Sequence, residues 1–379
     1  MGNFIFLLLV VLDDVAPDQL GVTLTHEHFS LDFHKFYCEP PQQLSRFFND
    51  GINEKIHLKN SGFIRQYPYG SKYNINFEDE DTHKAVLKDV HLFKEFGGGT
   101  IVENTTHGIN RNLKLMYEVA KSTGVKIVAG TGHYLQMTQK PETLNLTIEQ
   151  LEQIYTDEIL NGVEVKLSPS ESVTIKCGFI GEVGSVYPIT NFERRAIQAT
   201  AEVQGHLKCG VSFHPGRDAR APFEILRIYL EAGGDASKCV MSHLDRTLLN
   251  DEKLLEFASI GCYCQMDLFG NEVSWYQLNP SIDFPSDAQR VDRLKMLADE
   301  GKLERILASQ DIHTKHRLVS FRFLSSLQGC QISSFQTEFG GHGFAHLLNN
   351  VKPKMLLKGF TSDQINTIMV QNPAEWLQF

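Results

Sequence analysis

The stretch VTLTHEHF, residues 22–29, places two histidines at alternate positions of an apolar segment near the start of the chain. Residues at i and i+2 of a β-strand point to the same face, so His26 and His28 would present both imidazoles to one side and Glu27 to the other. One metal ion can bind both imidazoles. Histidine pairs also occur by chance in hydrogen-bonded strands, so the rest of the chain decides between the two interpretations.

From residue 80 onward, short apolar runs alternate with segments of helical periodicity. The predicted strands are residues 23–28, 99–103, 126–130, 177–183, 210–214, 238–243, 261–267 and 305–311. The predicted helices are residues 81–96, 113–122, 147–160, 193–206, 222–232, 252–259, 287–299 and 362–371. This alternation, without a long linker, favours one (β/α)₈ barrel (TIM barrel) domain over residues 1–379, with loop insertions and a C-terminal helix, rather than two domains.

Three stretches fit the alternation poorly, and the N-terminal residues need a separate interpretation. Residues 32–79 are rich in aromatic residues, Pro, Asn and Gly and are predicted to form a cap over the barrel mouth. Residues 163–176 are predicted to be a polar loop or hairpin, and residues 318–341 an insertion after the eighth strand. The apolar residues 1–20 lack a basic start and a small-residue cleavage site, which favours a buried strand or extension over a signal peptide.

The amino-acid composition indicates which class of partner and which cellular compartment suit the protein. A hydrophobic content of 42% predicts a substantial core. The net charge of −10 is spread along the chain, which disfavours nucleic acid and anionic membranes as partners and favours a small molecule. The seven scattered cysteines suit reduced thiols in a cytoplasmic protein better than a disulfide framework. Assembly into a homodimer is compatible with the sequence.

Metal-ligating residue types end several predicted strands. The active site of such a barrel lies at the C-terminal ends of its strands, so these residues would converge on one rim. A carboxylate in the apolar stretch GFIGEVG would cost several kcal/mol without a metal or a basic partner. For Glu182 considered by itself, a metal ion and a basic partner are both possible. The candidate residues taken together favour a metal site. The candidate ligands are His26, His28, Glu182, His214, His243 and Asp311.

For the other polar residues near the strand ends, the sequence supports more than one role. Asp245 and Arg246 follow His243 and would contact substrate or form a structural ion pair. Asp267 would contact substrate or anchor a ligand, and His133 would line the pocket with Asn104 and Thr105. Loop and helix positions are preferred over metal ligation for His313, His316, His342 and His346.

These motifs, in this order, resemble the phosphotriesterase-related proteins of animals, a branch of the phosphotriesterase family in the amidohydrolase superfamily. The resemblance extends from about residue 21 to residue 379. The stretches that carry it are LTHEHF (24–29), VENTTHGI (102–109), KCGFIGEVG (176–184), FHPGR (213–217), VMSHLDRT (240–247), CYCQMDLFG (262–270), DIHTKHRL (311–318) and GGHGFAHLLNNVKPKMLLKG (340–359).

The resemblance implies a binuclear centre of two divalent ions, with Zn²⁺ preferred and Mn²⁺ or Co²⁺ as alternatives. His26, His28 and Asp311 would hold the more buried ion, and His214 and His243 the more exposed one. Glu182 would bridge them, where bacterial members of the family use a carbamylated lysine. The branch also implies hydrolysis of N-acetyltaurine and related N-acyl compounds. Residues 318–341 depart from the family pattern, which puts the substrate more in doubt than the metal.

The expected reaction is amide hydrolysis by a hydroxide that bridges the ions, with Asp311 and Glu182 as catalytic residues and Asp311 passing the proton to the leaving amine. Two ions contribute +4, while Glu182, Asp311 and the hydroxide contribute −3, so an anionic substrate would be attracted. A phosphotriesterase or lactonase reaction at the same centre is the alternative. A metal-binding barrel without turnover is a third interpretation.

Overall fold

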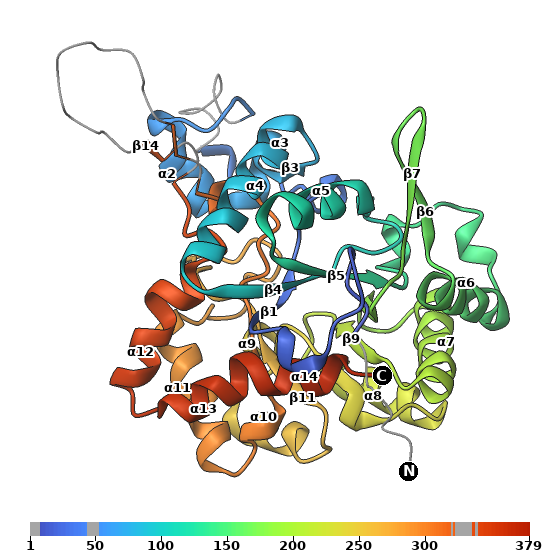
Figure 1. Ribbon diagram of the computed structural model, residues 1–379. Coiled ribbons are helices and arrows are strands. Elements are labelled where there is room, and N and C mark those ends of the chain that lie inside the picture. The colour runs from blue at the N-terminus through green and yellow to red at the C-terminus, as the bar shows by residue number, and fades with distance from the viewer. Residues whose placement is uncertain (1–7, 44–52, 320, 323–335, 338–339) are drawn as a thin grey trace.

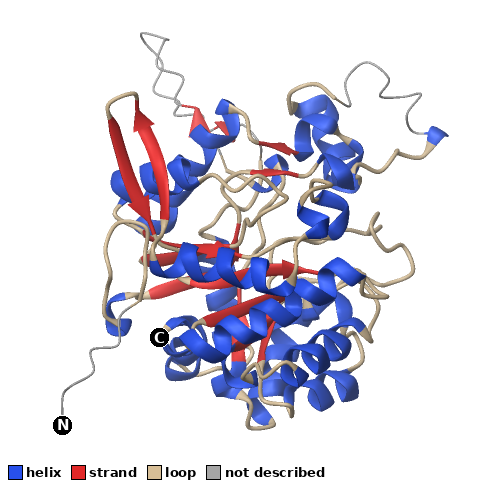
Figure 2. Ribbon diagram, turned by 90° about the vertical axis from the view of Figure 1, so that its right-hand side faces the viewer, coloured by secondary structure: helices blue, strands red, loops and turns tan. Residues whose placement is uncertain are grey.

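The computed structural model describes residues 8–43, 53–319, 321–322, 336–337 and 340–379. It confirms the predicted (β/α)₈ barrel: an eight-stranded parallel sheet runs in the order β1-β4-β5-β8-β9-β10-β11-β12 and curls into a nearly closed barrel (Figures 1 and 2). The strands are β1 (Val22–Glu27), β4 (Gly98–Glu103), β5 (Lys126–Thr131), β8 (Phe179–Gly184), β9 (Gly210–His214), β10 (Cys239–Met241), β11 (Tyr263–Met266) and β12 (Ile306–Ala308).

Helices follow the barrel strands and cover the outside of the sheet (Figure 1). Capping residues mark several starts; for example, Thr190 and Glu193 form a capping box at α7. None of the helices that the structure describes is long and apolar enough to cross a membrane. The helices between strands are α4 (Glu80–Glu95), α5 (Leu113–Thr123), α6 (Ile148–Leu160), α7 (Asn191–Leu207), α8 (Ala221–Glu231), α9 (Leu244–Thr247), α10 (Asp251–Ala258) and α11 (Asp287–Asp299).

Four of the predicted strands extend beyond the observed ones, the first of them by a single residue, since β1 ends at Glu27. The prediction carried the sixth strand to residue 243 and the eighth to residue 311, but β10 ends at Met241 and β12 at Ala308. His243 and Asp311 have φ angles of 57° and 51°, a left-handed conformation that a β-strand excludes. The seventh strand, predicted to reach residue 267, ends at Met266. These candidate ligands therefore lie in turns just beyond the strand ends.

The bottom of the barrel is filled by apolar side chains from both termini. Leu8, Val10 and Trp376 pack with residues of the strand interiors in one buried cluster. Of the two alternatives predicted for the N-terminal stretch, a strand or an extension, the described residues 8–20 form an extension with one isolated β-bridge; residues 1–7 lie outside the described part. Leu8 and Val15 pair through backbone hydrogen bonds of 2.8 and 3.0 Å, because the chain bends over residues 11–13.

The C-terminal segment is longer than the single helix predicted at residues 362–371. It comprises α12 (Lys352–Leu357), α13 (Ser362–Asn366) and α14 (Asn372–Leu377), with π-helical turns at Leu347–Val351 and Thr367–Gln371. Pro373 lies where the π-helical turn Thr367–Gln371 passes into α14.

Elements above the strand ends surround the barrel mouth. Residues 32–79 include α2 (Leu58–Gln66) and α3 (Lys72–Ile75), and β2 (Leu31–Asp32) pairs with β3 (Asn76–Phe77). Residues 163–175 form the hairpin of β6 (Val163–Ser168) and β7 (Glu171–Ile175), which projects from the body in Figure 1. Most of residues 318–341 lie outside the described part, apart from a short pairing of β13 (Phe321–Arg322) with β14 (Gln336–Thr337).

A largely buried ion pair joins α6 to the loop between β4 and α5. Arg111 donates to both carboxylate oxygens of Glu158 at 2.8 and 3.0 Å, and His107 Nε2 lies 2.8 Å from Glu158 Oε1. Burial raises the pKa of Glu158, but His107 and Arg111 outweigh it and hold this pKa far below its ordinary value of 4.5.

We expect Glu158→Gln to lower the free energy of unfolding by about 3–5 kcal/mol at pH 7, because Arg111 is left buried without its counter-charge. A depressed folded-state pKa contributes stability that is complete above the unfolded-state pKa and is lost as pH falls. The difference between wild type and variant, measured by urea unfolding, should therefore be constant near neutrality and shrink below about pH 4.3. A difference that grows on acidification would contradict this assignment.

Candidate metal centre

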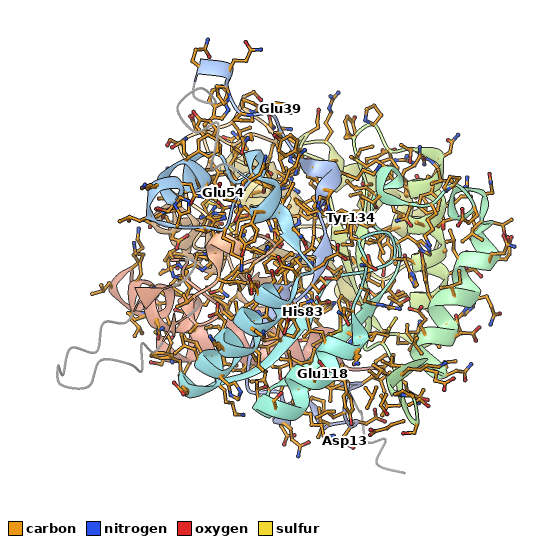
Figure 3. The ribbon with its side chains drawn as sticks, turned by 90° about the horizontal axis from the view of Figure 1, so that it is seen from above. Asp13, Glu39, Glu54, His83, Glu118 and Tyr134 are labelled. Carbon is orange, nitrogen blue, oxygen red and sulfur yellow. The ribbon has the colours of Figure 1, made fainter. Side chains whose placement is uncertain are left out.

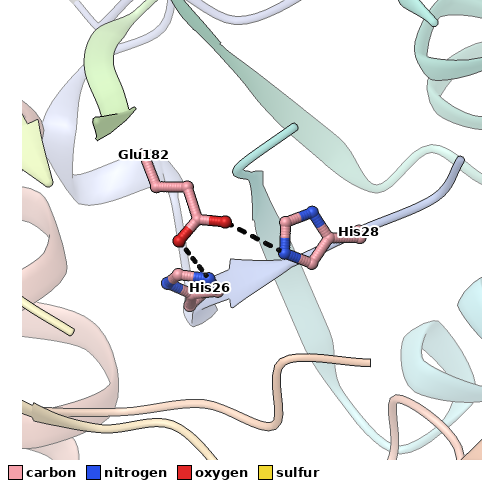
Figure 4. Close-up of side chains that lie close together, drawn as sticks. All are labelled: His26, His28 and Glu182. Carbon is pink, nitrogen blue, oxygen red and sulfur yellow. Dashed lines mark ion pairs between the residues drawn. The ribbon is translucent and has the colours of Figure 1, made fainter. Parts of the chain in front are cut away.

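Glu182 lies at the centre of a cluster of imidazoles at the barrel mouth. Its Oε1 lies 3.6 Å from His28 Nε2 and its Oε2 lies 3.5 Å from His26 Nε2 (Figure 4). On its other side, Glu182 Oε2 lies 2.9 Å from His214 Nδ1 and 3.6 Å from His243 Nε2. One carboxylate from β8 thus faces histidines from β1, β9 and the end of β10.

Asp311 completes the half of the cluster that faces β1. Its Oδ1 lies 3.2 Å from His28 Nε2 and 3.8 Å from His26 Nε2. Asp311 follows β12 in the left-handed turn described above, a backbone conformation that costs of order 1–3 kcal/mol for a residue other than glycine. All six candidate ligands predicted from the sequence therefore meet at one place.

The donor set fits a divalent transition metal. Three overlapping groups of three ligand atoms lie within 4.8 Å of one another at the barrel mouth. They are His26, His28 and Glu182; Glu182, His214 and His243; and His26, His243 and Asp267. Imidazole nitrogens with carboxylate oxygens are the ligands that Zn²⁺, Mn²⁺ and Co²⁺ accept. His26 Nε2 is buried and has no hydrogen-bond partner among the described residues, although it points at this cluster. A metal ion bound at the cluster would satisfy this ring nitrogen.

The electrostatics of the cluster favour ligand forms for most of its members. Burial lowers the pKa of His26 to about 3, and it also lowers that of His214 well below the ordinary value. Burial disfavours a charged His28, but hydrogen bonding to Asp311 and the charge of Glu182 outweigh it and raise its pKa to about 9. Metal binding would compete with this proton, because only neutral imidazole is a ligand.

Hydrogen bonds behind the cluster orient the imidazoles. His243 Nδ1 lies 2.7 Å from Asp267 Oδ1, and His28 Nδ1 lies 2.9 Å from Thr105 Oγ1, which in turn donates to Glu103 at 2.7 Å. Such partners fix which ring nitrogen faces the metal position. Asp267 therefore stands behind His243, and it does not line the cavity where substrate would bind.

The cluster forms the floor of a cavity at the barrel mouth. Phe33 and Tyr69 from residues 32–79 line it, and so does Tyr134 from the loop after β5. Tyr134 is labelled in Figure 3. The Tyr134 hydroxyl lies 3.2 Å from His214 Nδ1. The other lining side chains include Leu31, Ile109, Arg217, Arg246, Leu268, Asn271, Tyr276, Phe284 and His313.

The weaker candidates are divided between the cavity and the scaffold. Arg246 lines the cavity and donates to Pro215 O at 3.1 Å. Asp245 is fully buried and forms an ion pair with Arg290 at 2.8 Å, which supports the structural alternative. His133 lines a different cavity and lies 2.9 Å from the Tyr155 hydroxyl.

Asn104 and three of the remaining histidines also lie in the scaffold. Asn104 bonds the carbonyls of Thr25 and Val102. The loop and helix positions expected for His316, His342 and His346 are observed, with polar partners on Asn74, Arg317 and Asp287 respectively.

Arg217 and Tyr134 are cavity residues that the sequence analysis missed. Arg217 ends the FHPGR motif three residues after His214, and Tyr134 follows His133 directly. The available signal was their position just past a strand end. His313 also lines the cavity, with Nδ1 2.7 Å from Asp311 O and Nε2 3.0 Å from the Tyr69 hydroxyl.

The chain resembles known proteins over almost its entire length. It is 55% identical to a phosphotriesterase-related protein of Aedes aegypti over 96% of both chains, and 50% identical to one of Drosophila persimilis over 97% of this chain and 98% of that one. A resiniferatoxin-binding protein from Rhodobacter sphaeroides has the same fold, with a TM-score of 0.84, 24% identity and coverage of 98% and 94%. Residues 8–377 match the model of the phosphotriesterase family, and the chain belongs to that family.

Proposed function

We propose that this protein is a binuclear metal-dependent hydrolase that cleaves the amide bond of small anionic N-acyl compounds of the N-acetyltaurine or N-acetyl amino acid type. The proposal rests on the family, on the ligand cluster and on one further observation. Arg217 lines the same cavity as the cluster, and its terminal NH₂ groups have no hydrogen-bond partner among the described residues. A guanidinium placed in this way binds a carboxylate or sulfonate.

The proposed ligand assignment follows the distances in the cluster. His26, His28 and Asp311 would hold one ion, His214 and His243 the other, and Glu182 would face both. Divalent ions held there would polarise the scissile carbonyl and lower the pKa of a water molecule towards neutrality.

Asp311 is the proposed proton carrier. Burial raises its pKa, but His313 and His28 outweigh burial and hold this pKa well below the ordinary value, so the carboxylate is ionised and can accept a proton at Oδ. An amine leaves an amide only when it is protonated, and Asp311 reaches the cavity from its floor. Its proposed step is therefore to take a proton from the attacking water and pass it to the leaving nitrogen.

The remaining cavity residues would bind and enclose the substrate. Arg217 Nε donates to the Tyr276 hydroxyl at 3.0 Å, which orients the guanidinium. Arg246 adds a second positive charge to the wall. Phe33, Tyr69 and Phe284 would exclude water from the reacting atoms.

The test is a substrate panel for the zinc- or manganese-loaded protein. N-acetyltaurine, N-acetyl amino acids, lactones and an aryl phosphotriester are compared by kcat/KM. We expect the anionic N-acyl compounds to be hydrolysed best. A clear preference for a lactone or a phosphotriester would contradict the amidase proposal and establish the alternative reaction at the same centre.

Removal of metal is expected to abolish all of this activity. Dialysis against a chelator should lower the rate in proportion to the metal lost, and added Zn²⁺, Mn²⁺ or Co²⁺ should restore it. Metal content and rate are measured on the same samples. Full activity in protein that retains no metal would contradict the proposed centre.

A further inference from the structure

Glu27 is the middle residue of the His-Glu-His triplet, and it points away from the cluster that its neighbours form. Its side chain is completely buried. Its Oε1 accepts hydrogen bonds from Ser309 Oγ at 2.8 Å and Gln310 N at 2.9 Å, and its Oε2 accepts one from Ile312 N at 3.0 Å. Both oxygens of the Glu27 carboxylate therefore accept hydrogen bonds from the segment that follows β12.

The two backbone donors flank Asp311. Gln310 N and Ile312 N lie on either side of it, and one carboxylate binds both. Asp311 itself has the left-handed φ of 51°, which needs support from its surroundings. We call Gln310, Asp311 and Ile312 the Asp311 turn.

Little else joins β1 to β12 at this point. The described strand pairings include no ladder between them, and the eight-stranded order ends at these two strands. Besides Glu27, the main backbone links at the mouth are Asp311 N to His26 O at 3.0 Å and His26 N to Ser309 Oγ at 2.9 Å. The Glu27 carboxylate and these two bonds together fix the position of Asp311 relative to His26 and His28.

Arg317 holds the same turn from its carbonyl side. Its guanidinium donates to the carbonyl oxygens of Asp311, Gln310 and Phe269, and its side chain is buried. Two N–H groups of the Asp311 turn are therefore bound by the Glu27 carboxylate, and two of its C=O groups by the Arg317 guanidinium. Both side chains leave the Asp311 carboxylate free to face the imidazoles.

We propose that Glu27, supported by Arg317, is a positioning residue that ties the ligand Asp311 to the ligands His26 and His28. This inference rests on the proposed metal centre. The triplet would then supply two ligands on one face of β1, and on the other face the residue that places a third ligand. Glu27 itself touches neither metal nor substrate.

Glu27→Gln tests the inference at constant side-chain shape. An amide has one acceptor oxygen, so its NH₂ group must face at least one of the donors that the carboxylate now accepts. We expect the affinity for Zn²⁺, measured by competition with a chromophoric chelator, to fall about 10–100-fold. The visible spectrum of the Co²⁺-loaded protein should also change, because the ligand environment of the ion changes.

Glu193→Gln is the matched control. Glu193 is a fully buried carboxylate that accepts hydrogen bonds from Gln136 N, Val186 N and Thr190 N, in loops that carry no ligand of the cluster. It should lower the melting temperature of the metal-free protein about as much as Glu27→Gln does, while Zn²⁺ affinity and the Co²⁺ spectrum stay as in wild type.

The outcomes separate this inference from the proposed function. If wild type binds Zn²⁺ and Glu27→Gln binds it equally, with an unchanged Co²⁺ spectrum, the inference is wrong and the metal centre stands. If wild type takes up no ion, the proposed centre fails and the inference fails with it. If Glu27→Gln does not fold, Arg317→Lys decides by the same two readouts, because lysine keeps the charge but loses the planar fork that binds several carbonyls.

Discussion

Glu182→Ala is expected to remove bound metal and hydrolytic activity together. Glu182 is the only carboxylate of the described cluster that lies within 4 Å of all four histidines, at 2.9 to 3.6 Å. Its removal takes a ligand from both proposed ions at once. We expect kcat/KM to fall by about 10³-fold or more, equivalent to roughly 4 kcal/mol of transition-state stabilisation.

The measurement pairs elemental analysis with the rate of N-acetyltaurine hydrolysis. Asp89→Asn is the control, because Asp89 is a buried carboxylate that binds Val319 N at 2.8 Å and does not line the cavity of the cluster. It should keep its metal and most of its activity. If Glu182→Ala retained full metal content, Glu182 would be a scaffold residue and not a shared ligand.

Arg217→Met is expected to weaken the hydrolysis of anionic substrates selectively. Methionine keeps much of the apolar stem but removes the guanidinium from the cavity wall. A hydrogen bond to a charged group contributes about 1.5–3 kcal/mol, so kcat/KM for N-acetyltaurine should fall roughly 10–150-fold. Most of the change should appear in KM, because the anionic group is remote from the amide that reacts.

A neutral lactone or phosphotriester, which has no anionic group for Arg217 to bind, serves as the comparison substrate for the Arg217→Met variant. Its kcat/KM should change little, whatever its absolute value. Arg220→Met is the matched control, since Arg220 is exposed and pairs with Asp218 at 2.7 Å outside the cavity. Equal losses for charged and neutral substrates in Arg217→Met would show that Arg217 shapes the cavity rather than recognising an anion.

The barrel and the ligand cluster could be predicted because both depend on local patterns. Each strand is a short apolar run, and parallel strands in a barrel bring their C-terminal ends to one rim. Glu182, His214 and His28 were therefore placed correctly from their position at a strand end alone. The turns at His243 and Asp311 were not foreseen, because a left-handed residue leaves no mark in an apolar run unless it is glycine.

The residues that support the candidate ligands and those that line the cavity could not be predicted, because their positions depend on contacts between segments that are distant in the sequence. Asp267 precedes the cavity-lining residue Leu268 in the sequence, yet its carboxylate contacts His243 and does not line the cavity. Asp245 is taken by Arg290, a residue of α11 far along the chain. Phe33 and Tyr69 reach the cavity from residues 32–79, whose path no periodicity predicts. Composition identified that segment, but only the fold shows which of its side chains enclose the site.

The role of Glu27 illustrates the same limit. Alternation along β1 predicts that it faces away from His26 and His28. It cannot predict that the opposite face meets the segment after β12, because that contact exists only when the first and last strands of the barrel come together.

The most direct test of the account is anomalous X-ray diffraction from crystals of the zinc-loaded protein, measured on both sides of the zinc absorption edge. The account predicts two peaks at the barrel mouth, one among His26, His28 and Asp311 and one beside His214 and His243, with the Glu182 carboxylate between them. The absence of any peak at this cluster, in protein that contains zinc by elemental analysis, would contradict it.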